Sequence, residues 1–435
     1  MSEYRPIRVA LLGAGSVGAE VARLLLTQKA ELAARVGAEL ELVGIAVRDL
    51  KTKRSGFPKE LLTTDAESLI LGADIVIEVM GGLQPAKDYI LLALNSGSDV
   101  ITANKSLLAT HGSELFSAAD QVGAQLYFEA SVAGAIPIIR PLRESLAGDR
   151  VKRIMGIVNG STNYILDRMD KSGATLEVAM KEATELGYLE ADPSLDVDGY
   201  DAAQKAAILA SLAFHTEVPL EKVYREGITA ISADQIAAAK RDGYVIKLLA
   251  ICEFIEADEA GGEGISVRVY PALVPRSHPL GSVDGAYNAV FVEAEAAGRL
   301  MFYGSGAGGT QTASAILGDV VSAAKRHVAG GPGLADSIHA NFEILDMGRV
   351  KTRYVIQLEV KDQPGVLAKI ATLFSTHKVS IETVEQAVLE RESTTASLEI
   401  GTHLASDQAL TAVVEALKSN EAVESVMSVI RVEGI

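Results

Sequence analysis

The sequence predicts an α/β protein in which a doubly wound parallel sheet is followed by an α+β domain and a small ferredoxin-like unit. Three observations lead to this prediction. Short apolar runs alternate with helical segments over the first third of the chain, as they do in βαβ units. A glycine-rich turn, residues 13–18, joins the first apolar run to the first helix. The end of the chain has the element order βαββαβ within about 80 residues.

The first third of the chain supplies the elements of the doubly wound sheet. Residues 7–12 form a short apolar run that ends at a glycine, which predicts a buried parallel strand. A helix is expected over residues 16–27, and further strands are expected at residues 40–47, 74–79 and 99–102. Helical segments separate these strands. The alternation predicts a Rossmann-type sheet with helices on both faces.

From about residue 137 the pattern becomes that of an α+β substrate domain. Its expected strands and helices cover residues 151–158, 164–169, 176–186, 199–214, 265–273 and 289–296. A second glycine loop, residues 304–309, precedes a long helical pattern over residues 312–328. This loop either returns the chain to a cofactor or is an ordinary flexible entry to a helix, and the sequence leaves both interpretations open.

The last part of the chain reads as a self-contained unit. A helix is expected over residues 364–377, with Asp362 available as its cap. The other expected elements are strands at 353–360, 379–388, 393–402 and 422–432 and a helix at 407–418. A cluster of glycine and proline at residues 329–333 indicates the start of a linker. The predicted domains are a dinucleotide-binding domain (1–136, completed by 304–328), a catalytic, substrate and dimerisation domain (137–303), a linker (329–351) and a ferredoxin-like domain (352–435).

The composition is that of a soluble globular protein, with 48% hydrophobic and 22% charged residues. A length of 435 residues suggests two or three domains. The net charge of −17 argues against a nucleic-acid surface, because phosphate binding needs a basic patch. The single cysteine, Cys252, excludes an intramolecular disulfide and fits a reducing compartment. We see neither a signal peptide nor an apolar run of about 18 residues, so we expect a cytoplasmic protein without a membrane span.

The turn after the first strand has the fingerprint of a dinucleotide-binding loop. Gly13 allows the tight turn, Gly15 lets the backbone approach the pyrophosphate, and Gly18 permits close helix–strand packing. The N-terminus of the following helix offers N–H donors to phosphate. The expected cofactor-binding residues in this part of the chain are Gly13, Ala14, Gly15, Ser16, Val17, Gly18 and Gly81.

The end of the second strand is expected to select between NAD and NADP. An acidic residue there holds a ribose 2′-OH, whereas an arginine suits a 2′-phosphate. Arg48 follows this strand, and Lys51, Lys53 and Arg54 come shortly after it, but Asp49 weakens the distinction. The sequence therefore favours NADP, with Arg48 as the selector, and NAD is the alternative. A solvated surface loop is the other interpretation of these cations.

The stretch from Gly187 to Lys205 is the strongest candidate for acid–base chemistry. Asp201 and Lys205 are four residues apart and so share one face of a predicted helix. Reducing an aldehyde needs a hydride and a proton for the developing alkoxide, and a lysine oriented by a carboxylate can deliver that proton. An exposed ion pair is the alternative, but the apolar flanks of this pair predict a buried helix. Four upstream carboxylates could hold a cationic substrate group: Glu190, Asp192, Asp196 and Asp198.

Other chemistries fit this sequence less well. An EF-hand alignment of the acidic stretch puts Lys205 where a bidentate glutamate is required, so the EF-hand interpretation fails. We find no His/Cys set with zinc-like spacing and no serine-based triad. Lys105, in contrast, follows a strand whose carboxyl end should border the ligand crevice, so it is expected near cofactor or substrate. A surface lysine is the alternative there.

Four segments, read in order, resemble homoserine dehydrogenases: residues 101–105, 129–137, 156–164 and 187–205. The resemblance covers residues 7 to about 325. It implies the reversible reduction of L-aspartate 4-semialdehyde to L-homoserine with NAD(P)H, on the route to threonine, isoleucine and methionine. It further implies Lys205 as the proton donor, Lys105 near nicotinamide and substrate, and Glu190 near the substrate amino group. Gly187, Asp196 and Asp201 are the other implied substrate residues, and which lysine dominates proton transfer stays open.

The same resemblance implies a monovalent-cation site and a second approach to the cofactor. The cation, expected to be sodium, would be held by Glu129 and by the carbonyls of Val132, Gly134 and Ile136. Gly306 resembles the glycine at which the chain returns to the cofactor.

The C-terminal unit, in which residues 362–367 open the first helix, resembles an ACT domain. Such domains pair side by side and bind amino acids, so threonine, the end product of the pathway, is the natural effector. A dimerisation domain without a ligand is the alternative. A homo-oligomer, either a dimer or a tetramer, is expected. Two rival functions remain: an oxidoreductase with another substrate on the same scaffold, and an NADP- and amino-acid-binding sensor without turnover.

Overall fold

The computed structural model describes residues 4–189, 192–331, 339–388 and 395–434. Two compact units can be distinguished, and each is assembled from three segments of the chain. The first unit consists of Met1–Gly160, Asp201–Val223 and Ala286–Asn341. The second consists of Ser161–Tyr200, Tyr224–Gly285 and Phe342–Ile435.

The first unit contains a six-stranded parallel sheet with the strand order β3-β2-β1-β4-β5-β6. This is the order of a doubly wound dinucleotide-binding sheet, as predicted. Its strands are β1 (Ile7–Leu12), β2 (Leu40–Ala46), β3 (Leu62–Thr63), β4 (Ile75–Glu78), β5 (Asp99–Thr102) and β6 (Leu126–Tyr127). The crevice at the carboxyl ends of β1 and β4, where the order reverses, is the place where such sheets bind their ligands.

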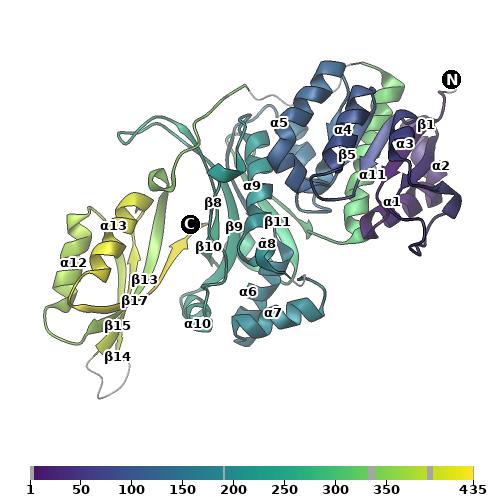
Figure 1. The fold of residues 1–435 in the computed structure, drawn as a ribbon. Helices are drawn as coiled ribbons and strands as arrows, with labels where there is room; N and C mark the ends of the chain where they lie inside the picture. The colour runs from purple at the N-terminus through teal and green to yellow at the C-terminus, as the bar shows by residue number, and fades with distance from the viewer. Residues whose placement is uncertain (1–3, 190–191, 332–338, 389–394, 435) are drawn as a thin grey trace. The chain divides into compact units, whose positions relative to one another are not determined.

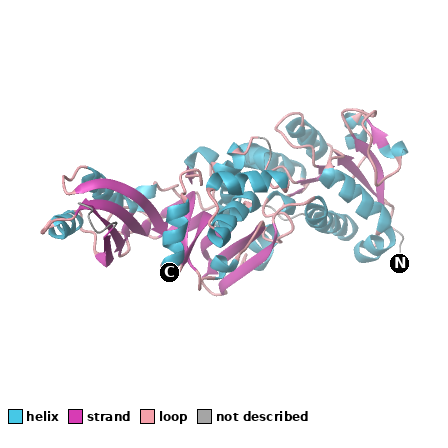
Figure 2. Cartoon of the chain, turned by 90° about the horizontal axis from the view of Figure 1, so that it is seen from below, coloured by secondary structure: helices cyan, strands magenta, loops and turns pink. Residues whose placement is uncertain are grey.

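Helices cover both faces of this sheet (Figures 1 and 2). Val9 and Leu11 belong to the core formed with the first helices, whereas their neighbours Ala10 and Leu12 are equally buried outside that core. Successive side chains of a strand point to opposite faces, so both faces are covered. The helices of this part are α1 (Ser16–Thr27), α2 (Lys29–Val36), α3 (Ala66–Leu71), α4 (Ala86–Asn95), α5 (Lys105–Val122) and α11 (Gly309–Ala329).

Helix α11 lies beside α1 although nearly 300 residues separate them in the sequence (Figure 1). A Cβ at Gly309 would lie 3.0 Å from the carbonyl oxygen of Ser16, so glycine permits this close packing. Ile316 and Val320 of α11 share the core of β1. The chain thus returns after this glycine loop to the parallel sheet, and its approach to a cofactor stays a prediction.

The first unit also contains three antiparallel strands and the helix α9. These strands are hydrogen-bonded in the order β12-β11-β7. The strands and the helix are β7 (Val151–Ile157), β11 (Tyr287–Ala294), β12 (Gly298–Ser305) and α9 (Tyr200–Ala213).

The second unit is organised around strands that are hydrogen-bonded in the order β9-β10-β17-β13-β15-β14. Strands β9 (Tyr244–Ile255) and β10 (Gly264–Pro275) form a long antiparallel pair, and β8 (Tyr224–Arg225) pairs with β10. Helices of this unit include α6 (Gly160–Ser172), which begins at its boundary, α7 (Leu176–Glu185), α8 (Ser194–Val197) and α10 (Ala233–Arg241).

The end of the chain forms the predicted βαββαβ arrangement within this unit. Two helices cover one face of its four-stranded antiparallel sheet, and their core contains Ile370, Phe374 and Leu410. Its elements are β13 (Lys351–Lys361), α12 (Val366–Thr376), β14 (Ile381–Val388), β15 (Thr395–Thr402), α13 (Asp407–Lys418) and β17 (Val423–Val432), with β16 (Ala405–Ser406) pairing with β13.

Two features of the fold differ from what the sequence predicted. Asp362 is not the cap of α12, because the helix begins at Val366 and the preceding Gly365 adopts a left-handed conformation with φ 89° and makes no side-chain cap. The long strand β9 was not predicted, because its apolar run lacks the alternation of a half-buried strand and eight consecutive residues are buried. Among the described residues, no helix is long and apolar enough to cross a membrane.

Candidate active site

The first glycine loop forms an open cradle at the N-terminus of α1. Gly13 has φ 106°, and a Cβ there would lie 2.9 Å from the carbonyl oxygen of Val79. A Cβ at Gly18 would lie 2.2 Å from the carbonyl oxygen of Gly13, so both positions require glycine. A Cβ at Gly15, in contrast, would meet no atom within 4 Å. The loop therefore leaves space over the helix N-terminus, where backbone N–H groups favour an anion.

The loop after β2 separates its arginine from its aspartate. The carboxylate of Asp49 accepts hydrogen bonds from the N–H of Lys51 at 2.8 Å and from the hydroxyl of Thr52 at 3.0 Å. These bonds lower the pKa of Asp49 and turn its side chain into its own loop. Arg48 is exposed, and its guanidinium makes no hydrogen bond or ion pair within the described parts of the chain. Asp49 is thus engaged by its own loop, whereas Arg48 is not.

The carboxyl ends of β4 and β5 are joined by a buried glutamate that sequence reasoning missed. Glu78 is fully buried and accepts a hydrogen bond of 2.6 Å from the hydroxyl of Thr102. Its other oxygen accepts the N–H groups of Met80 and Gly81 at 2.7 and 3.2 Å. Glu78 thereby fixes the glycine loop after β4, including Gly81. An acid at the end of an otherwise apolar strand was the available signal.

Lys105 is held at the start of α5 by the residue before it. The side-chain oxygen of Asn104 caps the helix by accepting the N–H of Leu107 at 3.2 Å, and its amide donates to the carbonyl of Gly82 at 2.7 Å. The N–H of Asn104 in turn donates to Thr102 at 3.0 Å. The motif at residues 101–105 therefore works as a unit that presents Lys105 at the carboxyl edge of the sheet.

Asp201 brings two lysines together from distant parts of the chain. Its Oδ2 accepts from Nζ of Lys205 at 2.7 Å, and its Oδ1 pairs with Nζ of Lys105 at 2.7 Å. The amide of Asn159 also donates to Oδ2, at 2.9 Å. Nζ of Lys205 further donates to the carbonyl oxygen of Val158 at 2.6 Å. The predicted pairing of Asp201 with Lys205 is thus present, whereas the contacts from Lys105 and Asn159 were not predicted.

This Lys–Asp–Lys cluster is buried on one side and open on the other. The side chains of Asp201 and Lys205 are 7% and 10% exposed, whereas that of Lys105 is 39% exposed. Burial alone would raise the pKa of Asp201, but the charges of Lys205 and Lys105 outweigh it and hold that pKa far below its usual range. The interpretation of the pair as a surface ion pair is therefore wrong, because alanines at positions 202, 203, 206 and 207 bury the helix around it. An ionised carboxylate here can keep both lysines charged and oriented.

Glu129 has a role in this structure beyond the one expected of a cation ligand. Its carboxylate accepts the N–H groups of Ile138, Ile139 and Arg140 at 2.7, 2.8 and 3.0 Å. Asp319 accepts the N–H of Glu129 at 2.9 Å, and the pKa of Asp319 is raised to about 6, chiefly by burial. The Glu129 side chain is thus bound to the following backbone.

Backbone carbonyls near Glu129 remain available to a cation. Within the described residues, the carbonyl oxygens of Val132, Gly134 and Ile136 accept no hydrogen bond. The same loop meets the second glycine loop, because a Cβ at Gly134 would lie 2.4 Å from the carbonyl oxygen of Gly306. Among the described residues, no group of three or more His, Cys, Asp or Glu side chains could hold a metal ion.

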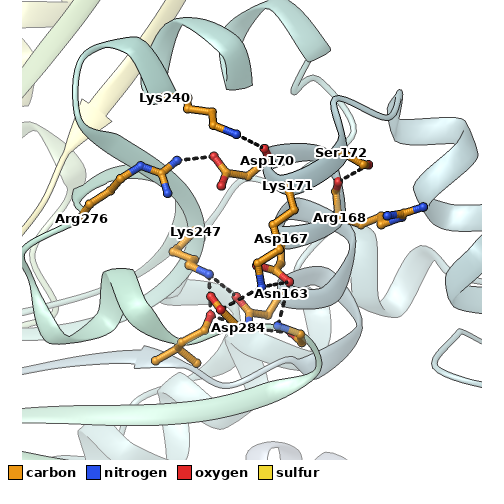
Figure 3. A network of polar contacts seen from close by, with 12 residues as sticks. Asn163, Asp167, Arg168, Asp170, Lys171, Ser172, Lys240, Lys247, Arg276 and Asp284 are labelled. Atoms are coloured by element: carbon orange, nitrogen blue, oxygen red, sulfur yellow. Dashed lines mark hydrogen bonds and ion pairs between the residues drawn. The ribbon is translucent and has the colours of Figure 1, made fainter.

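The remaining predicted substrate residues belong to the second unit. Gly187 follows α7 in a left-handed conformation with φ 78°, and Asp196 lies half-buried in the short helix α8. Glu190 lies outside the described residues. Asn163, in the motif at residues 156–164, accepts a hydrogen bond of 3.0 Å from the buried Nζ of Lys247 (Figure 3). That lysine also donates to the carbonyl of Val283 at 2.6 Å.

Comparisons with known proteins agree with this arrangement. The family model described as homoserine dehydrogenase matches residues 137–321, and the model of the homoserine dehydrogenase NAD-binding domain matches residues 13–129. A sequence from Mycobacterium tuberculosis called homoserine dehydrogenase is 54% identical, with 99% of each chain covered. This chain belongs to the homoserine dehydrogenase family. A homoserine dehydrogenase from Corynebacterium glutamicum is 53% identical over 98% of this chain and 96% of its own length. The ACT domain model matches residues 354–422, so the predicted C-terminal ACT domain is confirmed.

Solved structures of this family have the same fold. A homoserine dehydrogenase from Thiobacillus denitrificans superimposes with a TM-score of 0.91 at 37% identity and covers 99% of both chains. A homoserine dehydrogenase from S. aureus gives a TM-score of 0.77 at 30% identity over 99% of this chain and all of its own. A hyperthermophilic archaeal homoserine dehydrogenase, solved with NADPH, gives 0.61 at 28% identity over 76% of this chain and 100% of its own.

Proposed function

We propose that this homoserine dehydrogenase interconverts L-aspartate 4-semialdehyde and L-homoserine with the Lys105–Asp201–Lys205 cluster as its acid–base centre. One observation carries this proposal: a buried, ionised carboxylate holds two lysine ammonium groups at 2.7 Å each. A nicotinamide cofactor, when bound, supplies the hydride. The chain itself must supply a proton to the aldehyde oxygen in reduction and accept it in oxidation.

Lys205 is the group to which we assign the proton transfer. Its ammonium is oriented by Asp201 and by the carbonyl of Val158, so it is held in one position without rearrangement. Lys105 is more exposed and lies at the carboxyl edge of the parallel sheet, where the nicotinamide of a bound cofactor would be. We therefore assign Lys105 to the orientation of substrate and cofactor. We assign the binding of the substrate amino group to Glu190, and we assign Asp196 and Gly187 as further substrate-binding residues.

We assign NADP as the preferred cofactor, with the phosphates over Gly13–Gly18 and Arg48 at the 2′-phosphate. The open space at Gly15 and the exposed N-terminus of α1 support the first assignment. The engagement of Asp49 with its own loop supports the second, because it leaves Arg48 as the group facing outward. Gly81 and Gly306, from the loops after β4 and β12, complete this proposed site.

We assign a monovalent cation, sodium by preference, to the carbonyls of Val132, Gly134 and Ile136. Their lack of hydrogen bonds in the described structure supports this, and so does the hardness of carbonyl oxygen as a ligand. Glu129 would act through the backbone it holds, since its carboxylate is already bonded to three N–H groups. The effect of replacing sodium by a larger monovalent cation on thermal stability and on the KM for homoserine tests this site.

We assign an amino-acid effector, threonine by preference, to the ACT domain, and a homo-oligomer to the intact protein in the cytoplasm. The match to the ACT family supports a regulatory role. Initial rates of L-homoserine oxidation, with NADP and NAD in parallel and with or without L-threonine, test the catalytic and regulatory assignments together. Turnover with other amino alcohols in place of homoserine would favour the rival specificity. NADPH binding without turnover would favour the sensor.

A further inference from the structure

Arg431, close to the end of the chain, is enclosed by aromatic rings from three strands. Its guanidinium carbon lies 4.7 Å from the ring centre of Tyr270 on β10, 5.5 Å from that of Tyr354 on β13 and 5.6 Å from that of Tyr224 on β8. The side chain is only 12% exposed. Cation–π attraction is strongest where the cation is desolvated, so this position favours an arginine.

Two carboxylates complete the surroundings of Arg431, and they come from different parts of the second unit. Its Nε donates to Asp407 at 3.0 Å, at the first residue of α13 in the ACT domain. Its Nη1 donates to Glu226 at 2.8 Å, directly after β8. The hydroxyl of Tyr354 donates to the same oxygen of Asp407 at 2.7 Å. One guanidinium therefore links the ACT domain to the segment that follows β8.

The backbone reinforces this link. Strand β17 pairs in parallel with β10, with Arg431 opposite Ala272. Beyond the strand, the N–H of Glu433 donates to the carbonyl of Leu273 at 2.9 Å, and its carboxylate accepts from the hydroxyl of Tyr270 at 2.5 Å. The ACT domain is thus joined to β10 both by main-chain hydrogen bonds and by the side-chain contacts of Arg431.

The segment after β8 in turn holds the acidic stretch that leads into the catalytic helix. Arg225 donates to the carbonyl of Asp198, and its guanidinium carbon lies 3.5 Å from the ring centre of Tyr200. The N–H of Ile228 donates to the carbonyl of Val197 at 2.8 Å. A Cβ at Gly227 would lie 2.6 Å from Cα of Asp198, so the two backbones touch. Tyr200 is the first residue of α9, the helix that carries Asp201 and Lys205.

We propose that Arg431 is a positioning residue for the active site. Through Glu226 it fixes residues 225–228, and these fix residues 196–200, which carry Asp196 and lead into α9. The inference rests on the proposed substrate role of this stretch. It assigns to the ACT domain a direct mechanical connection to substrate binding, and the glycine loop that binds the cofactor is not part of that connection.

The test compares Arg431→Met with Glu226→Gln and the double variant. We expect the KM for L-homoserine to rise about 3- to 30-fold, the range typical of mutations along a coupling network, while the KM for NADP stays within about twofold. The double variant should be no worse than the more impaired single variant, because both remove the same link. Arg431→Lys should recover part of the loss. Arg353→Met is the matched control, because Arg353 pairs within the ACT domain with Glu382 at 2.7 Å, and its kinetics should not change.

Hydrogen exchange of the peptide containing residues 196–200 gives a second readout that needs no turnover. Exchange should be faster in Arg431→Met and in Glu226→Gln than in the parent, and unchanged in Arg353→Met. If Arg431→Met does not fold, the homoserine KM and the hydrogen exchange of Glu226→Gln alone test the inference. Unchanged homoserine KM and unchanged exchange in folded protein would overturn the inference, as would an equal rise in both KM values. Absence of homoserine oxidation by the parent would instead refute the proposed function, and the exchange data would still test the link.

Discussion

Replacement of Asp201 by asparagine probes the centre of the proposed site. The amide keeps the shape of the carboxylate but removes the charge that pairs with Lys205 and Lys105, each at 2.7 Å. Since Lys205 is 10% exposed, its ammonium would be left buried without its anion. Breaking a buried pair in this way costs about 3 to 5 kcal/mol. Lys105 is 39% exposed and is partly solvated, so its share is small, and we expect about 3 kcal/mol in total.

The effect on catalysis should be larger than the effect on stability suggests. A lysine that loses its orienting carboxylate no longer meets the substrate oxygen in one fixed geometry, and positioned proton transfer contributes about 10²- to 10⁴-fold. We therefore expect kcat for L-homoserine oxidation to fall by at least about 100-fold in Asp201→Asn. The affinity for NADPH, measured by cofactor fluorescence, should be nearly unchanged. The rates are measured by NADPH formation at saturating homoserine.

The pH dependence of the free energy of unfolding gives a second test of the same variant, because the direction of its change can be predicted. Because the pKa of Asp201 is lowered in the folded protein, its contribution is fully present above the unfolded value of about 3.9 and is lost as the pH falls through the folded value. The stability difference between parent and Asp201→Asn should therefore be constant near neutral pH and shrink in acid. Chemical unfolding at a series of pH values measures it.

Asp258→Asn is the control for this prediction. Asp258 also pairs with two cations, Arg349 at 3.1 Å and Lys351 at 3.2 Å, but it is 31% exposed. Its loss should change stability by less than about 1 kcal/mol and leave kcat unchanged. A folded Asp201→Asn variant with parental kcat would refute the reasoning, and so would equal effects of the two substitutions.

Three further predictions concern other parts of the molecule. Lys205→Met should lower kcat by orders of magnitude and leave NADPH affinity within about twofold, and parental turnover would remove Lys205 from the mechanism. Arg48→Asp should shift the ratio of kcat/KM values from NADP toward NAD by at least about tenfold, since a 2′-phosphate would then face a carboxylate, and an unaltered ratio would exclude Arg48 as the selector. Burial lowers the pKa of Lys247 to about 8, so the folded protein loses this proton at a lower pH than the unfolded chain does. The free energy of unfolding of the parent, relative to that of Lys247→Met, should therefore rise by up to about 3 kcal/mol between pH 8 and about 10.4. Unfolding curves of both proteins across that range check it, and a flat difference would contradict the burial of a charged lysine.

Local patterns were sufficient to predict the parts of the fold that depend on neighbouring residues. The helix at Ser16–Thr27 and the strand at Ile7–Leu12 are present at the predicted bounds, because an apolar period and a glycine turn specify them. The helical pair Asp201 and Lys205 was predictable for the same reason, since four residues make one turn. Asp362 was assigned as a cap because the start of α12 was placed two residues too early, where Gly365 in fact ends the loop.

Contacts between segments that are distant in the chain could not be predicted from the sequence. Lys105 meets Asp201 across 96 positions of the chain, and only the assembled sheet brings the two together. Glu78 and Asn159 hold the site through side chains whose partners are fixed by the fold. The parallel pairing of β17 with β10, and with it the Arg431 cluster, joins segments about 160 residues apart. A single sequence contains no periodic signal for such pairing.

The measurement that tests the central claim most directly is the initial rate of L-homoserine oxidation by the full-length protein and by Lys205→Met, with NADP and NAD in parallel. The proposed mechanism predicts turnover by the parent, faster with NADP, and a loss of at least about 100-fold in the variant while NADPH still binds. Equal turnover by parent and variant would contradict the role of the Lys105–Asp201–Lys205 cluster. No turnover by a folded parent that binds NADPH would contradict the proposed reaction itself.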